Sequence, residues 1–235
     1  MVLSHISGIM RKRTLQILPN VYQLTMMRVN IILIVEEELT LIDTGFRGSS
    51  AQITDFIHRL GRSVEEISLI IITHSHFDHV GGLPELKSLT KAKVAAHKAE
   101  ILLECTRMTS GLMRIPPFSV LRSVFSVKSS EVDIQLEGEE VLKPLGGLKV
   151  IHTPGHTPGS ISLFSPQNKL LIVGDALNKR RWLPPRIVST DLAQALNSIK
   201  RMAQLDFDIL CFGHGRPLTG DVRNRMLDWL DKIRD

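Results

Sequence analysis

The sequence contains very little cysteine. Two occur among 235 residues, Cys105 and Cys211, and they lie far apart and in no C-x-x-C pair. This scarcity argues against a disulfide framework and against a cysteine zinc knuckle. Cys211 lies in the apolar run 209–212, which favours a small buried core residue. A chain of this length buries a substantial core without disulfides, so we expect the hydrophobic core to hold the fold together.

Long hydrophobic runs and a secretory signal are also missing. No stretch approaches the roughly 20 apolar residues that a membrane span needs. The basic cluster at 11–13 follows the mildly apolar N-terminal stretch, whereas a secretory signal has the opposite order. These absences predict a cytoplasmic protein without a membrane span.

The remaining composition is that of a globular enzyme. Apolar residues make up 43% of the chain and charged residues 23%. No linker of Gly, Ser or Pro divides the sequence, so we predict a single domain over residues 1–235.

Short apolar and β-branched runs alternate with turn residues along most of the chain, which is typical of strands. The predicted strands are 14–18, 21–25, 29–36, 39–43, 68–73 and 93–96, then 132–136, 141–145, 148–152, 160–164, 169–173 and 208–212. Helical periodicity predicts helices over 49–60, 84–89, 190–204 and 218–233. Two strand-rich halves, each finished by helices, predict two sheets packed face to face with helices outside.

Four side chains suited to binding metal follow the buried strand 68–73 within six residues: His74, His76, Asp78 and His79. Histidines two apart on an extended segment point the same way, so His74 and His76 can bind one ion. Asp78 and His79 lie beyond the turn and can reach a second ion nearby. Nitrogen and carboxylate ligands suit Zn²⁺, Mn²⁺ or Fe²⁺ better than Ca²⁺ or Mg²⁺.

Three further candidates lie at later strand ends. His156 lies in a turn punctuated by proline and glycine, Asp175 closes the predicted strand 169–173, and His214 follows the strand 208–212. Polar residues at the ends of apolar strands can converge on one rim of a sandwich. A carboxylate such as Asp175 can bridge two cations about 3.5–4 Å apart.

Taken in order, these segments resemble the five motifs of the metallo-β-lactamase superfamily. The matching segments are Leu41-Ile-Asp43-Thr-Gly45, Thr73-His74-Ser-His76-Phe-Asp78-His79, Gly155-His156, Gly174-Asp175 and Gly213-His214-Gly215. The resemblance implies an αββα sandwich, an α/β fold with a dinuclear site at one edge.

The resemblance also implies how the ligands are divided between two transition-metal ions, with zinc favoured over manganese or iron. The first ion would take His74, His76 and His156, the second would take Asp78, His79 and His214, and Asp175 would bridge both. Asp43 would orient ligands by hydrogen bonds without binding metal.

The expected activity is hydrolysis of a carboxylic acid derivative, an ester, lactone or thioester, by a metal-bridging hydroxide. Asp78 is the expected catalytic residue, orienting the nucleophile and carrying its proton to the leaving group.

Alternatives are phosphodiester or nucleic acid cleavage and a mononuclear-iron dioxygenase of the same superfamily. A dedicated β-lactamase is disfavoured, since the β-lactamases of the family are generally secreted and generally lack the bridging aspartate, although weak β-lactamase activity as a side reaction fits the site. Many lactonases of the superfamily have a tyrosine shortly after the bridging aspartate, which holds the substrate carbonyl. This chain has none in the segment 176–179, and Tyr22 is its only tyrosine.

Two stretches, 105–130 and 176–190, carry eight Lys and Arg and no acid, against a net charge of +5 for the whole chain. Both fall between ligand motifs, so we expect them beside the site, where they favour an anionic, partly hydrophobic small-molecule substrate. The residues predicted to contact it are Arg180, Arg181, Trp182 and Phe118. Residues 105–130 would form either a lid or an interface in a homo-oligomer. The charge also suits nucleic acid, although an aromatic content of 5% is low for that role.

Two other histidines have simpler interpretations. His97 is expected to be a capping or surface residue. His152, four residues before His156, is expected not to bind metal.

Overall fold

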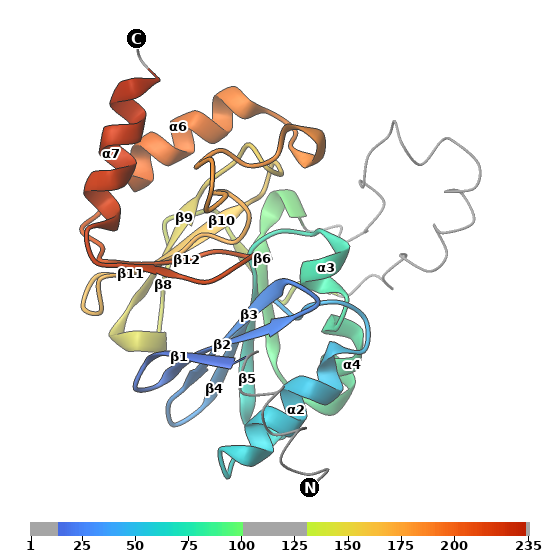
Figure 1. Ribbon diagram of the computed structural model, residues 1–235. Helices are drawn as coiled ribbons and strands as arrows, with labels where there is room; N and C mark the ends of the chain where they lie inside the picture. The colour runs from blue at the N-terminus through green and yellow to red at the C-terminus, as the bar shows by residue number, and fades with distance from the viewer. Residues whose placement is uncertain (1–13, 101–130, 234–235) are drawn as a thin grey trace, which may run out of the picture.

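The computed structural model describes residues 14–100 and 131–233, and their strands form two sheets (Figure 1). The seven-stranded sheet has the order β1-β2-β3-β4-β5-β6-β7 and the six-stranded sheet the order β13-β12-β11-β10-β9-β8. The strands of the first sheet are β1 (Thr14–Leu18), β2 (Val21–Met26), β3 (Val29–Val35), β4 (Leu39–Ile42), β5 (Ile67–Ile72), β6 (Lys93–His97) and β7 (Ile134–Leu136). Those of the second are β8 (Val141–Leu142), β9 (Leu148–His152), β10 (Ile161–Ser165), β11 (Leu170–Ile172), β12 (Ile209–Cys211) and β13 (Leu218–Thr219).

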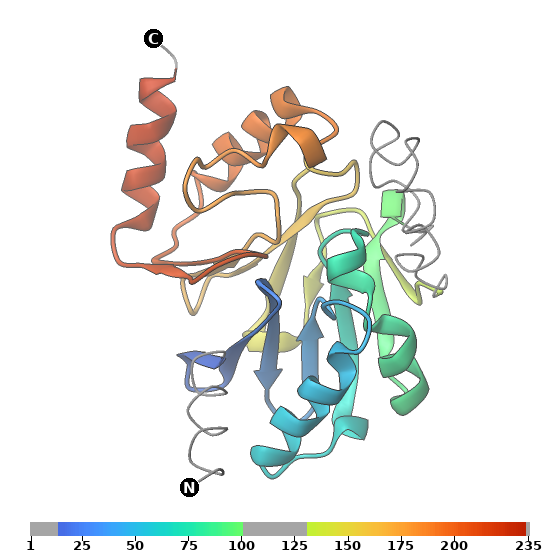
Figure 2. The same cartoon turned by 45° about the vertical axis from the view of Figure 1, so that its right-hand side comes forward.

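Helices cover the outer face of each sheet. Figures 1 and 2 show α2 and α4 on one side of the molecule and α6 and α7 on the other. The α-helices are α2 (Ser49–Arg59), α3 (Phe77–Val80), α4 (Leu83–Leu89), α6 (Leu192–Met202) and α7 (Val222–Lys232), and the 3₁₀ turns are η1 (Val64–Glu66), η2 (Lys98–Glu100), η5 (Pro144–Gly146) and η6 (Arg186–Val188). The predicted αββα sandwich is confirmed.

The alternation of side chains along each strand creates three hydrophobic layers. In β3, Ile31 and Leu33 pack in a cluster that includes Ile53 of α2, while Ile32 and Ile34 face a cluster shared by both sheets. This is the two-residue period of a strand that is buried on both faces. A third cluster lies between the second sheet and the helices α6 and α7. Cys211 is fully buried in the central layer, as its apolar run predicts.

Three predicted elements differ from the structure. The run 132–136 was expected in the second set of strands, but β7 pairs in parallel with β6 in the first sheet. The strand 141–145 is shorter, because Pro144 lacks an N–H to donate and begins η5. The helix 218–233 is a strand, β13, followed by α7, and Gly220 with φ +87° makes the break between them.

Hydrogen bonds join the two sheets at one common edge. The Ile161 N–H donates to the Thr73 carbonyl at 2.9 Å, and the Asn30 N–H donates to the Gly213 carbonyl at 2.7 Å. The Asn30 side chain also donates to the Phe212 carbonyl at 2.8 Å. Each bond ties a residue of one sheet or its loops to the other, so the segments at this edge are held in fixed relative positions.

No helix of the described residues is both long enough and apolar enough to traverse a bilayer.

Candidate metal centre

All seven predicted ligands lie at the edge where the sheets are joined. His74 and His76 follow β5, Asp175 follows β11, and His214 follows β12. His156 lies in the turn between β9 and β10. Strand ends on one edge of a sandwich bring distant parts of the chain together, and the described side chains form overlapping clusters that could hold a metal. They divide into two groups: the first is His74, His76 and His156, and the second is Asp78, His79, Asp175 and His214.

The first group is a trio of histidines whose ring nitrogens converge. His74 Nε2 lies 3.1 Å and His156 Nε2 lies 2.9 Å from His76 Nδ1. Nitrogens bound tetrahedrally to one zinc ion lie about 3.3 Å apart, so the trio is close to ligand spacing. Burial lowers the pKa of His74 well below its ordinary value and lowers that of His156 to about 3. Both rings are therefore neutral at pH 7, which leaves a lone pair for a metal.

The second group combines carboxylates with His79 and His214. His214 Nε2 lies 3.1 Å from Asp175 Oδ2 and 3.4 Å from Asp78 Oδ2. The fully buried His79 Nε2 faces the same carboxylates at 3.6 and 3.9 Å and has no hydrogen-bond partner among the described residues. A buried polar atom without a partner is costly, so a metal ligand role fits this nitrogen.

Charge in this second group favours a cation. Burial lowers the pKa of His79 and His214, but neighbouring carboxylates outweigh it, Asp43 most strongly for His79 and Asp175 most strongly for His214. The resulting pKa values are about 9 and about 10. Without metal, protonated imidazoles thus supply the positive charge that the carboxylates require.

Outer hydrogen bonds determine which nitrogen of each histidine is free. The Asp43 carboxylate accepts from His79 Nδ1 at 2.7 Å, and the Arg28 carbonyl accepts from His214 Nδ1 at 2.9 Å. Neither oxygen can donate, so Nδ1 keeps its proton and Nε2 is the nitrogen that would give up a proton to bind a metal. Asp43 thus contacts a candidate ligand, and its role in orienting metal ligands stays a prediction.

Two hydroxyl groups act in the same way on the first group. Thr73 Oγ1 donates to Asp43 at 2.8 Å, so it accepts from His74 Nδ1 at 3.0 Å. Ser189 Oγ donates to the Pro185 carbonyl at 2.8 Å and lies 3.3 Å from His156 Nδ1, as an acceptor. Neither hydroxyl was predicted from the sequence. The role of Thr73 was predictable, because Thr73 adjoins a candidate ligand. That of Ser189 was not, because Ser189 lies 33 residues from His156 and no motif in its own segment indicates the contact.

Gly213 allows the second group to pack this closely. A Cβ atom at this position would overlap the Asp175 carboxylate and the ring of His79. Any larger residue would therefore displace two candidate ligands at once.

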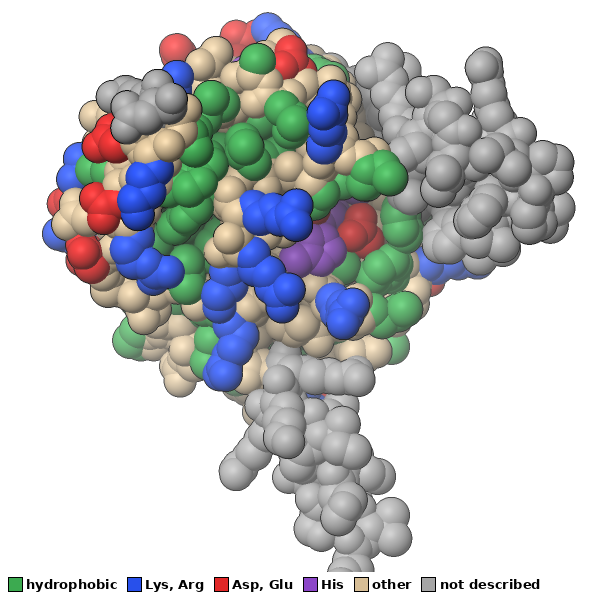
Figure 3. All heavy atoms as spheres, turned by 45° about the horizontal axis from the view of Figure 1, so that its top comes forward, with side chains coloured by type: hydrophobic (Ala, Val, Ile, Leu, Met, Phe, Trp, Pro, Cys, Tyr) green, Lys and Arg blue, Asp and Glu red, His purple; other side chains and the backbone are tan. Residues whose placement is uncertain are grey.

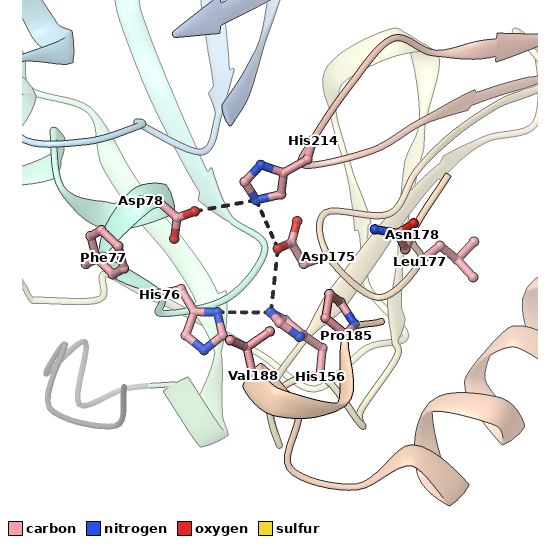
Figure 4. A pocket seen from close by; sticks show the side chains of 10 residues that line it. All are labelled: His76, Phe77, Asp78, His156, Asp175, Leu177, Asn178, Pro185, Val188 and His214. Atoms are coloured by element: carbon pink, nitrogen blue, oxygen red, sulfur yellow. Dashed lines mark hydrogen bonds and ion pairs between the residues drawn. The ribbon is translucent and has the colours of Figure 1, made fainter. Parts of the chain in front are cut away.

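The candidate ligands open into a cavity of about 290 Å³. One part of its lining is polar and the other is apolar: His76, Asp78, His156, Asp175, Asn178 and His214, then Phe77, Leu177, Pro185 and Val188. Figure 4 shows these side chains grouped around one space, and Figure 3 shows histidine and acidic side chains inside a hollow bordered by Lys and Arg on one side and by hydrophobic side chains on the other.

Comparison with known proteins assigns the family. The model of the metallo-beta-lactamase superfamily matches residues 24–214. The chain belongs to this superfamily. The protein YobT of Bacillus subtilis is 31% identical over 215 residues, covering 83% of this chain and 88% of that protein. The probable metallo-hydrolase YflN of the same organism is 30% identical over 206 residues, covering 77% and 76%.

Two further similarities bear on function and fold. A hydroxyacylglutathione hydrolase of Bartonella henselae is 33% identical over 150 residues, covering 63% of this chain and 49% of that enzyme. A metallo-beta-lactamase family protein from Thermus thermophilus has a similar structure, with a TM-score of 0.73 at 24% identity over 93% of this chain and 81% of that one. The Thermus structure shows the fold. The superfamily, whose members include probable metallo-hydrolases, is shown by the family model and by YflN.

The predicted substrate residues that the structure describes, Arg180, Arg181 and Trp182, do not line the cavity. Trp182 is 8% exposed and packs in the hydrophobic cluster beneath α6 and α7, because an indole ring stabilises the core more when buried. Arg180 and Arg181 are exposed on the same loop. Phe118 and most of the predicted lid, residues 105–130, lie outside the described residues. The loop instead reaches the cavity through four residues that were not predicted from the sequence: Leu177, Asn178, Pro185 and Val188.

His97 and His152 form a separate stacked pair. Their rings lie 4.0 Å apart at an interplanar angle of 11°. His97 is 4% exposed, so its predicted surface position is wrong, but its ring accepts the Ala99 N–H at 3.2 Å, as a capping residue does. His152 Nε2 donates to the Pro158 carbonyl at 2.8 Å, and His152 belongs to none of the candidate ligand groups of the described chain.

Proposed function

We propose that this protein is a hydrolase that binds two transition-metal ions, most simply zinc, and cleaves a carboxylic acid derivative. One observation carries the proposal. Asp175 Oδ2 lies 3.7 Å from His156 Nε2 and 3.1 Å from His214 Nε2, so one carboxylate adjoins both candidate ligand groups. That arrangement is what a bridging ligand of a two-metal site requires.

The proposed ligand sets follow the two groups and the tautomers described above. The first ion would be held by His74, His76 and His156 and the second by Asp78, His79 and His214, with Asp175 beside both sets of ligands. Bound ions of this kind supply Lewis acidity and lower the pKa of water toward neutrality.

The chain's own contribution centres on Asp78. Burial raises the pKa of this carboxyl group, but the His214 hydrogen bond and the charge of His79 outweigh burial and hold the pKa below its ordinary value. Asp78 is therefore an anion that lines the cavity and can accept a proton there. It would orient the attacking water and pass its proton to the leaving group. Phe77, Leu177 and Val188 would exclude bulk water around the acyl chain.

The substrate class follows from the relatives and from charge. The Bartonella relative is named as a hydrolase of hydroxyacylglutathione, a thioester, which supports acyl chemistry for this similar chain. Lys179, Arg180, Arg181 and Arg186 lie on the loop that reaches the cavity, and none of them forms an ion pair among the described residues. We therefore propose an anionic, partly hydrophobic ester, lactone or thioester.

Phosphodiester cleavage is the second candidate, since the same four cations would also attract phosphate. A mononuclear-iron dioxygenase is the third. Elemental analysis and a substrate panel of thioesters, aryl esters, lactones and bis(p-nitrophenyl) phosphate separate the three. We expect about two metals per chain and fastest turnover on an acyl substrate.

The variant Asp78→Asn should lower kcat by about 10²–10⁴-fold, the usual contribution of a general acid–base group. The control Asp133→Asn alters a carboxylate paired with Lys87 on the surface and should leave kcat unchanged. Saturation at one iron per chain, or faster turnover of the phosphodiester, would reject the proposed function.

A further inference from the structure

Glu100 is a buried acid outside the candidate ligand set. It ends the 3₁₀ turn η2 and is 4% exposed, and the described residues show no Lys or Arg paired with it. A buried carboxyl group needs hydrogen-bond donors from the protein to replace its lost contacts with water. Its donors therefore indicate what it does.

Those donors come from two separate loops. Glu100 Oε2 accepts the Ser75 N–H at 3.0 Å and also the Ser75 hydroxyl. Glu100 Oε1 accepts the Gly159 N–H at 2.8 Å. A Cβ atom at Gly159 would overlap the Glu100 side chain, so the second loop approaches this acid as closely as glycine permits.

Both loops carry ligands of the histidine trio. Ser75 lies between His74 and His76, and Gly159 lies three residues after His156. One carboxylate thus connects, by opposite oxygens, the β5 loop and the turn between β9 and β10. Asp43 has no such reach, because its contacts are with Thr73 and His79.

We propose that Glu100 is a positioning residue for the first metal, joining the loop of His74 and His76 to the loop of His156. It makes no contact with any candidate ligand of the second group. The effect of Glu100 should therefore be selective for the metal bound by the trio. This inference rests on the ligand division of the proposed function.

The test compares stepwise metal affinities in the metal-loaded full chain. Glu100→Gln keeps the size of the side chain but turns one acceptor into a donor that faces an N–H group. Glu100→Asp keeps the charge but is too short to contact both loops. We expect each variant to release one of its two metals to a competing chelator at about 10–100-fold lower chelator concentration, the usual effect of losing an outer-shell contact. The other metal should be unchanged.

Cobalt substitution provides a second readout. The visible absorption of one of two bound Co²⁺ ions should shift in Glu100→Gln, because its three histidines are no longer held in one geometry. Ser75→Ala removes a single donor and should weaken the same metal by about threefold. This milder variant keeps the inference testable if Glu100→Gln does not fold.

A matched control separates positioning from general stability. Glu140 also accepts backbone N–H groups, those of Glu137, Gly138 and Glu139, in a turn that carries no candidate ligand. Glu140→Gln should lower the Tm without changing either metal affinity.

Parallel weakening of both metals in the Glu100 variants, or a lower Tm with unchanged metal affinities, would overturn the inference. The outcomes for the proposed function are distinct. If the unaltered chain bound a single metal, the two-metal proposal would fail, and weaker binding of that metal in Glu100→Gln would still support Glu100 as the positioning residue.

Discussion

At the scale of single residues, the decisive feature is the partner of each histidine nitrogen. His156 has Nδ1 occupied by Ser189 and directs Nε2 toward His76 and Asp175. His152 has Nε2 bonded to a carbonyl and its ring stacked on His97. Two histidines four residues apart in the same segment therefore have different roles, because only one presents a free lone pair to the cavity.

This difference leads to a paired prediction. His156→Ala should lose at least one metal per chain, because it removes one of three convergent nitrogens. His152→Ala should retain both metals and most activity, with a cost of about 1 kcal/mol in stability for the lost hydrogen bond. Elemental analysis after gel filtration measures both. Equal metal loss in the two variants would show that the ligand assignment in this turn is wrong.

At the scale of elements, the site depends on strand ends and on one long loop. β5, β11 and β12 each end at the edge where the candidate ligands lie, and the loop after Asp175 lines the cavity. The loop's buried part, with Trp182, anchors it to the core, while Arg180, Arg181 and Arg186 are exposed. Anchoring on one face and exposed charge on the other suit a loop that attracts an anion toward the cavity.

Replacing Arg180 and Arg181 with Ala should raise KM for an anionic acyl substrate by about three- to tenfold at low salt and reduce its salt dependence. A neutral ester should be almost unaffected, since the cavity lining is unchanged. The control is the double replacement of Lys91 and Lys93, which removes the same charge at the start of β6, the end remote from the site. Equal effects on charged and neutral substrates would remove the argument for an anionic substrate.

At the scale of the whole molecule, the two sheets share one central core and the candidate metal centre. Residues of both sheets pack in the same cluster, and hydrogen bonds such as Asn30 to Gly213 cross between them. The candidate ligands also come from both halves of the chain. Neither half can therefore lose its structure without exposing the apolar face of the other.

We predict that the protein unfolds in one cooperative calorimetric transition and that removal of metal lowers its Tm. A free metal concentration of about 1,000 times the dissociation constant stabilises the folded state by about 4 kcal/mol. For a chain of this size, that free energy raises the Tm by roughly 10 °C. Scanning calorimetry before and after chelation measures both, with re-addition of zinc as the control for reversibility. Two separate transitions would contradict the single-domain prediction, and an unchanged Tm would contradict a metal bound to the folded state.

The sequence by itself predicted the layers of the sandwich, most of its strands, and the side chains that meet at the candidate metal centre. These features are encoded locally. A strand buried on both faces is a continuous apolar run, and four candidate ligands lie within six residues of one loop. The hydrogen bond between Asp43 and a candidate ligand was also predictable, since it follows from the resemblance of a short motif to a known superfamily.

Only the tertiary structure decided which other residues serve the site. Some contacts join residues that are far apart in the chain: Ser189 contacts the candidate ligand His156, and Glu100 accepts the Gly159 N–H. The sequence around each of these residues does not indicate its partner. The burial of Trp182 and the pairing of β7 with β6 likewise depend on how sheets and helices pack. Local patterns determine which surface of an element is apolar, but contacts between distant segments arise only when those surfaces are buried together.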